Sequence, residues 1–136
     1  MSSVIPDSVR RVVARRADYR CEYCLVREFD SFLPFQIDHI ASQKHGGGSE
    51  LENLAYACPH CNQHKGTDLA TFLDDYNDIV PLFNPRLQNW GDHFEIDEGI
   101  ISSKTKIGLA TIKTLKLNQP ERLMQRQILM EIGRYP

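Results

Sequence analysis

The sequence lacks the features that would mark a membrane, secreted or disordered protein. Its 136 residues contain no apolar run near the ~20 residues that a membrane-spanning helix requires. The N-terminal stretch MSSVIPDSVRR has no apolar core of the kind that a secretory signal peptide carries. Internal repeats and low-complexity segments are also missing. We therefore expect a soluble, cytoplasmic protein without a membrane partner, folded as a single domain over residues 1–136.

A strong net charge is absent too, since the formal charge at pH 7 is −2. The charges are nevertheless unevenly distributed along the chain. Basic residues outnumber acidic ones in residues 1–20 and 101–136, whereas acidic residues gather between positions 68 and 98. If the two basic ends fold onto one face, they would form a phosphate-binding surface. The alternative is that both ends are ordinary solvated helix faces.

The cysteines are few, but their spacing is informative. All of them fall in two C-x-x-C pairs, CEYC and CPHC, formed by Cys21, Cys24, Cys58 and Cys61. In an intracellular chain this pattern favours Zn²⁺ over disulfides, because each turn presents two thiolates on one side and two turns complete a tetrahedron. A closed four-thiolate site leaves no position for water, so this zinc would be structural. Replacement of one thiolate by His60 is the weaker alternative.

Hydrophobic periodicity predicts an α+β fold. It favours helices over residues 7–18, 105–117 and 120–132, and a helix from about Pro59 through Tyr76. Strands are predicted over 33–40, 51–58 and 93–96, the last continuing through the turn at 97–99 into a hairpin. Asp7 or Ser8 would cap the first helix. The three glycines at 46–48 mark a flexible loop.

Taken together, these segments resemble the HNH endonuclease family, the ββα-metal nucleases. The matching motifs are CEYC, IDHI, GG, ENL and CPHCNQHKG, within residues 21–66. Residues 81–96 also look like the extension of a group of small bacterial HNH proteins. The resemblance implies a ββα-metal core with a structural zinc site over residues 21–76, an N-terminal helix before it, and a C-terminal extension, residues 77–136, with a hairpin and helices packed on it. It implies a metal-dependent endonuclease for DNA, with the oligomeric state, monomer or homodimer, left open.

The resemblance also implies roles for individual residues. His39 would be the general base, and Asn53, the central asparagine, would brace the loop. Asp38 and Asn62 would hold the catalytic Mg²⁺ or Mn²⁺, which prefer such oxygen ligands to thiolates. Adjacent strand residues point to opposite faces, so Asp38 and His39 can share a site only if the strand ends or bends there. The glycine loop makes a bend plausible and would leave room for a DNA backbone.

Three further side chains, Lys65, His64 and Arg86, are candidates for contacts with nucleic acid. A plain solvated lysine is the alternative for Lys65, and His64 is a rival to Asn62 as metal ligand. Asn62 is alternatively a residue that only caps its helix, and His39 a core histidine. At the level of function, the alternatives are a zinc-stabilised nucleic-acid-binding module without catalysis and a nuclease that acts on RNA.

Overall fold

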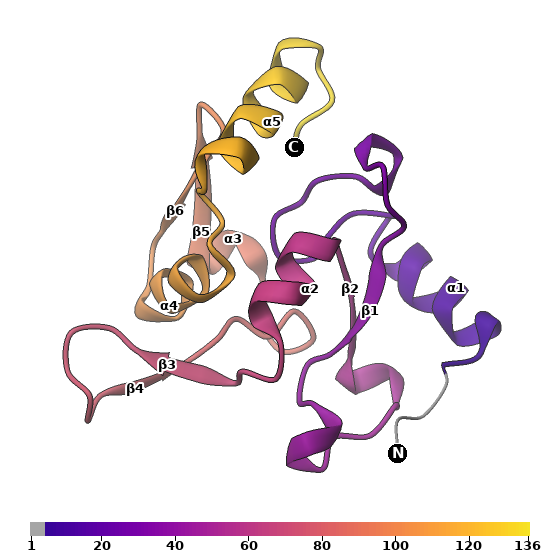
Figure 1. The fold of residues 1–136 in the computed structure, drawn as a ribbon, viewed down its shortest axis with the longest axis vertical. Helices are drawn as coiled ribbons and strands as arrows, with labels where there is room; N and C mark the ends of the chain where they lie inside the picture. Colours follow the sequence, from indigo (N-terminus) through magenta and orange to yellow (C-terminus); the bar gives the residue numbers. More distant parts are fainter. Residues whose placement is uncertain (1–4) are drawn as a thin grey trace.

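The structure, a computed structural model that describes residues 5–136, combines three small β-hairpins with short helices (Figure 1). The N-terminal half contains α1 (Asp7–Arg16), β1 (Gln36–His39), β2 (Leu54–Ala57) and α2 (Pro59–Lys65). Three single turns of 3-10 helix lie between them, at Glu28–Asp30, Gln43–His45 and Leu51–Asn53. The C-terminal half contains β3 (Ala70–Phe72), β4 (Ile79–Pro81), α3 (Trp90–His93), β5 (Phe94–Asp97), β6 (Ile100–Ser103), α4 (Lys106–Leu115) and α5 (Pro120–Glu131). No helix within residues 5–136 has the length and apolarity needed to cross a membrane.

The β1–β2 hairpin and α2 form the ββα unit that the motifs predict. The strands are antiparallel, and His39, the last residue of β1, pairs with Leu54, the first residue of β2. Cys58 follows β2 and caps α2, because its sulfur accepts a hydrogen bond from the Cys61 backbone N–H at 3.3 Å. Pro59 occupies the first turn of α2, where its missing N–H is tolerated. The expected α+β fold with an HNH-type core is therefore confirmed.

The helix predicted to run through Tyr76 is wrong. α2 ends at Lys65, and Gly66 then adopts φ +51°, a left-handed conformation that glycine tolerates. The next residues form β3, which pairs with β4 and places the Phe72 ring against that of Tyr76, with centroids 4.9 Å apart. The apolar spacing of this segment therefore reflects a hairpin, whose partner strand supplies the backbone hydrogen bonds.

Two smaller expectations also need correction. Pro6 occupies the cap position of α1 and no side chain caps this helix, so Asp7 lies in the first turn instead, where the helix dipole favours a carboxylate. The short helix α3 was not predicted. The β5–β6 hairpin, α4 and α5 form close to where the sequence predicts them.

Side chains from both halves of the chain contribute to one hydrophobic cluster. It includes Val13 of α1, Leu54 of β2, Ile101 of β6, Leu115 of α4 and Leu129 of α5. α1 and α2 lie on different sides of the β1–β2 hairpin, and α5 lies farthest from the N-terminus (Figure 1). β1 ends at the half-buried His39, directly before the loop that leads to β2.

Candidate functional site

The four cysteines form a compact buried cluster. Their sulfur atoms all lie within 4.8 Å of one another, and Cys24 Sγ is 3.8 Å from Cys58 Sγ. Four thiolates bound tetrahedrally at about 2.3 Å from a zinc ion would be about 3.8 Å apart. None of the four is in a disulfide, and all are buried. The donor set and its spacing therefore fit a structural zinc ion with no open coordination position.

A buried arginine stabilises negative charge on this cluster. Arg122 of α5 donates a hydrogen bond to Cys61 Sγ at 2.9 Å and lies 3.9 Å from Cys58 Sγ. It also donates to the backbone oxygens of Leu115 and Lys116, at 2.7 and 3.2 Å. Burial by itself lowers the pKa of Arg122, but the nearby thiolates more than reverse this and raise it. Arg122 thus joins the sulfur cluster to the C-terminal end of α4.

The thiols themselves differ in their environments. Burial raises the pKa of Cys21 and of Cys61, whereas hydrogen bonds from the other thiols lower the pKa of Cys24. The backbone N–H groups of Cys24 and Cys61 also donate to the sulfurs of Cys21 and Cys58, at 3.5 and 3.3 Å. Such donors favour thiolate over thiol, which is the form that binds a metal.

The C-terminal part of the chain also holds the first C-x-x-C turn in place. Trp90 Nε1 donates to the backbone oxygen of Tyr23 at 2.9 Å. The Tyr135 hydroxyl donates to the backbone oxygen of Cys24 at 2.7 Å. These contacts join residues far apart in sequence, so a pattern within one segment does not reveal them. Their consequence is that the cysteine cluster is supported from both halves of the chain.

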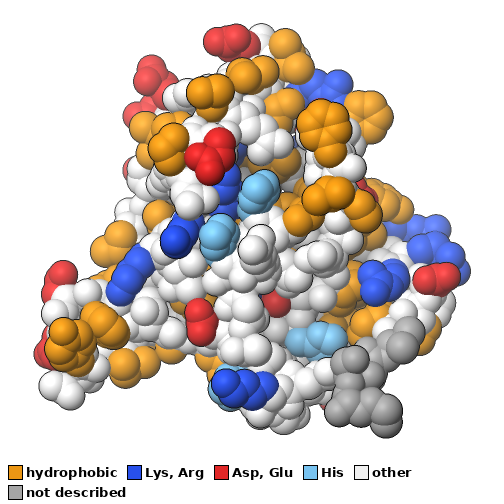
Figure 2. Space-filling view, in the orientation of Figure 1, with side chains coloured by type: hydrophobic (Ala, Val, Ile, Leu, Met, Phe, Trp, Pro, Cys, Tyr) orange, Lys and Arg blue, Asp and Glu red, His pale blue; other side chains and the backbone are white. Residues whose placement is uncertain are grey.

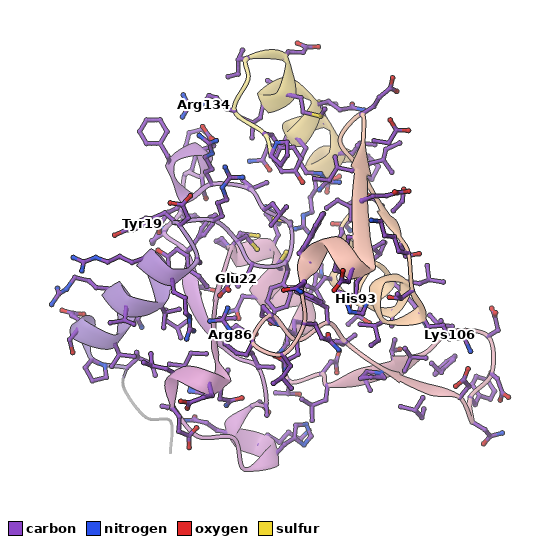
Figure 3. The ribbon with its side chains drawn as sticks, turned by 180° about the vertical axis from the view of Figure 1, so that it is seen from behind. Tyr19, Glu22, Arg86, His93, Lys106 and Arg134 are labelled. Carbon is purple, nitrogen blue, oxygen red and sulfur yellow. The ribbon has the colours of Figure 1, made fainter. Side chains whose placement is uncertain are left out.

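Arg86 contacts this same turn rather than an open surface. Its guanidinium forms an ion pair with Glu22 (Figure 3), and both side chains are 12% exposed. Burial raises the pKa of Glu22, and the positive charges of Arg86 and Arg16 oppose that rise. Arg86 therefore forms an internal ion pair with Glu22. It does not have the exposed position that a contact with nucleic acid requires.

A second feature is a cavity of about 360 Å³ beside the end of β1. Its wall includes Asp38 and His39 from β1, Lys44 from the loop after β1, and Asn62 and Gly66 from α2 and its end. The structure thus brings together, around one cavity, the residues that the sequence singled out as general base and metal ligands.

His39 is half-buried at this cavity. Its Nε2 lies 3.0 Å from the hydroxyl oxygen of Ser49, which follows the three glycines. His39 is the last residue of β1. Ser49 was not predicted as a site residue, since a serine after a glycine run gives no distinctive signal.

Asp38 is buried, 3% exposed, and both of its oxygens are used. Tyr23 donates its hydroxyl to Oδ2 at 2.7 Å, and Lys65 Nζ lies 3.2 Å from Oδ1. Burial raises the pKa of Asp38, and Lys65 and Tyr23 counteract this. Each carboxylate oxygen has a further lone pair, so a metal ion at this cavity would share Asp38 with both partners.

Lys65 does not have the surface position expected of a phosphate contact. It is 2% exposed, and Nζ also donates to the backbone oxygens of His39 and Ile40, at 3.3 and 3.0 Å. Lys65 therefore fixes the backbone at the end of β1 while neutralising Asp38. A lysine seen in sequence alone is read as exposed, because its buried partners lie elsewhere in the chain.

Asn62 and His64 occupy different positions on α2. The Asn62 side-chain nitrogen donates to Gln36 Oε1 at 2.6 Å, which leaves the amide oxygen as the group suited to a cation. His64 is not among the described residues that line the cavity. Burial, then Arg122 and Lys116, lower the pKa of His64, which favours its neutral form. Its position therefore does not favour His64 as the rival metal ligand, and its low pKa makes a charged phosphate contact less favourable.

Asn53 braces the loop between β1 and β2. Its side chain accepts from the Ala41 N–H at 2.8 Å and donates to the oxygens of Ala41 and Gly48, at 2.9 and 2.8 Å. Gly47 lies against this brace, because a Cβ there would be 1.7 Å from the Ala41 oxygen. Gly47 therefore lacks a side chain because the protein's own backbone passes close to it. The sequence had suggested that the glycine loop leaves room for DNA.

Comparison with known proteins agrees with the motifs. The family model described as HNH endonuclease matches residues 21–68, which include both cysteine pairs, β1, β2 and α2. No curated protein and no solved structure gave a significant match to the chain. Residues 21–68 of this chain are therefore similar to the HNH endonuclease domain.

Proposed function

We propose that the protein is a metal-dependent endonuclease that hydrolyses phosphodiester bonds in DNA, with His39 as the general base. The single observation that carries the proposal is the cavity within the HNH domain whose wall contains Asp38, His39 and Asn62. A histidine that lines a cavity together with two oxygen-bearing side chains is the set of groups that hydrolysis of a phosphodiester requires.

Each residue at the cavity then has a defined task. His39 accepts the proton of the attacking water, and the Ser49 hydroxyl orients the ring through its contact with Nε2. Asp38 and Asn62 hold the divalent cation, Mg²⁺ or Mn²⁺, which when bound supplies charge stabilisation for the phosphoryl oxygens. Lys65 and Tyr23 hold Asp38 in place through its two oxygens. The carboxylate is thereby oriented before the cation arrives.

In this account the cysteine cluster has a structural role. A zinc ion there would fix Cys58, which is both the end of β2 and the cap of α2. Asn62 lies one turn further along α2, so its distance from His39 depends on that cap. Zinc would therefore maintain the geometry of the cavity without taking part in the reaction.

A plasmid assay tests the proposal. Purified protein is incubated with supercoiled plasmid and Mg²⁺, Mn²⁺ or Zn²⁺, after its retained metal has been measured by elemental analysis. We expect zinc to remain through dialysis and cleavage to appear with Mg²⁺ or Mn²⁺. His39→Ala should abolish cleavage. His45→Ala is the matched control, because His45 lies nearby but contacts the Thr67 backbone oxygen and does not line the cavity. Equal cleavage by wild type and His39→Ala would reject the assignment.

A zinc-stabilised binding module without catalysis is the second candidate. The observation that favours it is the full engagement of Asp38 by Lys65 and Tyr23, which gives this carboxylate a structural use. This alternative predicts that the protein binds DNA but cleaves it with none of the three cations. Parallel reactions with an RNA substrate of the same sequence separate a ribonuclease from both candidates.

A further inference from the structure

We propose that the outer face of α1 binds the phosphate backbone of duplex DNA beside the cavity at His39; this rests on the nuclease function proposed above. The α1 arginine face consists of Arg10, Arg11 and Arg15. All three are exposed, and among residues 5–136 none of them forms an ion pair. Exposed, unpaired arginines are the groups that neutralise phosphates in protein–DNA complexes.

The arrangement of these arginines is unfavourable for the helix alone. Arg11 and Arg15 are separated by one turn, so they lie on the same side of α1, and both are exposed. Like charges at this spacing repel each other and destabilise a helix. A phosphate backbone removes that repulsion. The helix has 10 residues and so spans about 15 Å, a length over which duplex DNA carries several negative charges.

α1 is fixed close to the proposed catalytic residue. Arg16 donates to the backbone oxygens of Leu51 and Leu54, at 3.0 and 2.6 Å. Leu54 is the residue that pairs with His39 across the hairpin. The C-terminal end of α1 is therefore anchored one strand away from His39.

The distribution of the other charges also favours α1 as the surface that binds DNA. Figure 2 shows Lys and Arg side chains gathered over α1. The tip of the β3–β4 hairpin, on the opposite side in Figure 1, carries exposed Asp74, Asp75 and Asp78. The basic C-terminal helix that the sequence suggested as a second phosphate surface has its arginines, Arg122 and Arg126, buried among backbone oxygens and sulfurs. The surface is thus polarised, with basic side chains over α1 and acidic side chains at the tip of the β3–β4 hairpin, although the net charge of the chain is negative.

The chemistry of the cavity favours a duplex over a single strand. Proteins that bind single strands stack the bases on aromatic side chains. Among the described residues that line the cavity there is no Phe, Tyr or Trp, and His39 has the only ring. The cavity and α1 offer charged and polar side chains. Such side chains suit contacts with the phosphate backbone of an intact duplex.

The experiment measures how binding depends on salt. Fluorescence anisotropy with a labelled 20-base-pair duplex, on zinc-loaded protein without added Mg²⁺ or Mn²⁺ so that cleavage is prevented, gives the slope of log K against log salt concentration. Each phosphate contact contributes about 0.9 to that slope. For Arg11→Gln/Arg15→Gln we expect the slope to fall in magnitude by about 2 and the affinity at 0.1 M salt to fall on the order of 10- to 100-fold.

The matched control is Lys104→Gln/Lys106→Gln, which removes the same charge from exposed positions on the other side of the molecule, where Figure 3 labels Lys106. It should retain the wild-type slope. Circular dichroism should show both variants folded, because all four positions are exposed and glutamine is a good helix former at the three that lie in helices. Equal slopes for the two double variants overturn the proposal. The plasmid assay on wild type is scored separately, so a protein that binds through α1 without cleaving contradicts only the proposed function.

Discussion

The buried pair of Lys65 and Asp38 gives a sharp prediction. Their charged atoms lie 3.2 Å apart, with both side chains at most 3% exposed. Lys65→Met removes the cation but keeps much of the apolar stem. Asp38 would then be a buried carboxylate with only the Tyr23 hydroxyl as partner, and the oxygens of His39 and Ile40 would each lose a donor. Loss of one member of a buried ion pair destabilises a fold by about 3–5 kcal/mol, so we expect that loss here.

Urea unfolding of the zinc-saturated protein measures the effect. Asp38→Asn alone should also be destabilising, because it leaves the buried lysine without its carboxylate. Asp38→Asn/Lys65→Met should recover part of the loss, since neither charge is then unpaired, and the double-mutant cycle should yield a coupling of at least about 2 kcal/mol. A cost below about 1 kcal/mol for Lys65→Met, the value typical of an exposed pair, would refute the reasoning.

The same substitution predicts a pH dependence. Burial raises the pKa of Asp38 and Lys65 lowers it, so Lys65→Met should raise this pKa further. A carboxyl group whose pKa is higher in the folded than in the unfolded state stabilises the fold when protonated, and that contribution is lost as pH rises through the folded pKa. Lys65→Met should therefore be less destabilising near pH 4 than at pH 7. If Lys65→Met became more destabilising as the pH falls, the proposed effect of Lys65 on the pKa of Asp38 would be contradicted.

Three further substitutions test other parts of the fold. Gly47→Ala should destabilise by about 1–3 kcal/mol in urea unfolding, because its Cβ would collide with the Ala41 oxygen, whereas Gly91→Ala, with nothing within 4 Å, should change stability by less than about 1 kcal/mol. Arg122→Leu should release zinc to a colorimetric chelator about 10- to 100-fold faster than wild type, since it removes the donor to the thiolates; an unchanged rate would contradict this role. Asn53→Ala removes three hydrogen bonds and should lower the free energy of unfolding by about 2–4 kcal/mol; a change below about 0.5 kcal/mol would show that the brace is dispensable.

The predictable parts of the fold are those that a short stretch of sequence indicates by itself. The two C-x-x-C pairs, the alternation before Asp38 and the segment before Cys58 each indicate one element, and the cysteine cluster then determines how those elements meet. The β5–β6 hairpin follows from the turn before Ile100 for the same reason. None of these inferences required knowledge of a distant contact.

The parts that were missed depend on partners elsewhere in the chain. Residues 70–72 have helical spacing but pair with β4, so a tertiary hydrogen-bond partner overrides the local preference. Lys65 and Arg86 were predicted as contacts with nucleic acid, and Arg122 belongs to the basic segment 101–136 that was expected at the surface. Each is instead buried or nearly so against a carboxylate or thiolate distant in sequence. Charge alone does not identify such a partner, and burying a charge is tolerated only when one is present.

The most direct test of the proposed chemistry is chemical rescue of the general base. Single-turnover cleavage of a labelled duplex is measured with Mg²⁺ or Mn²⁺ for wild type, His39→Ala and Asn62→Ala, with and without added imidazole. We expect His39→Ala to lose cleavage and to regain part of it when imidazole diffuses into the vacated space beside Ser49. Asn62→Ala should also lose cleavage but should gain nothing from imidazole. Wild-type rates for His39→Ala without imidazole would contradict the central claim.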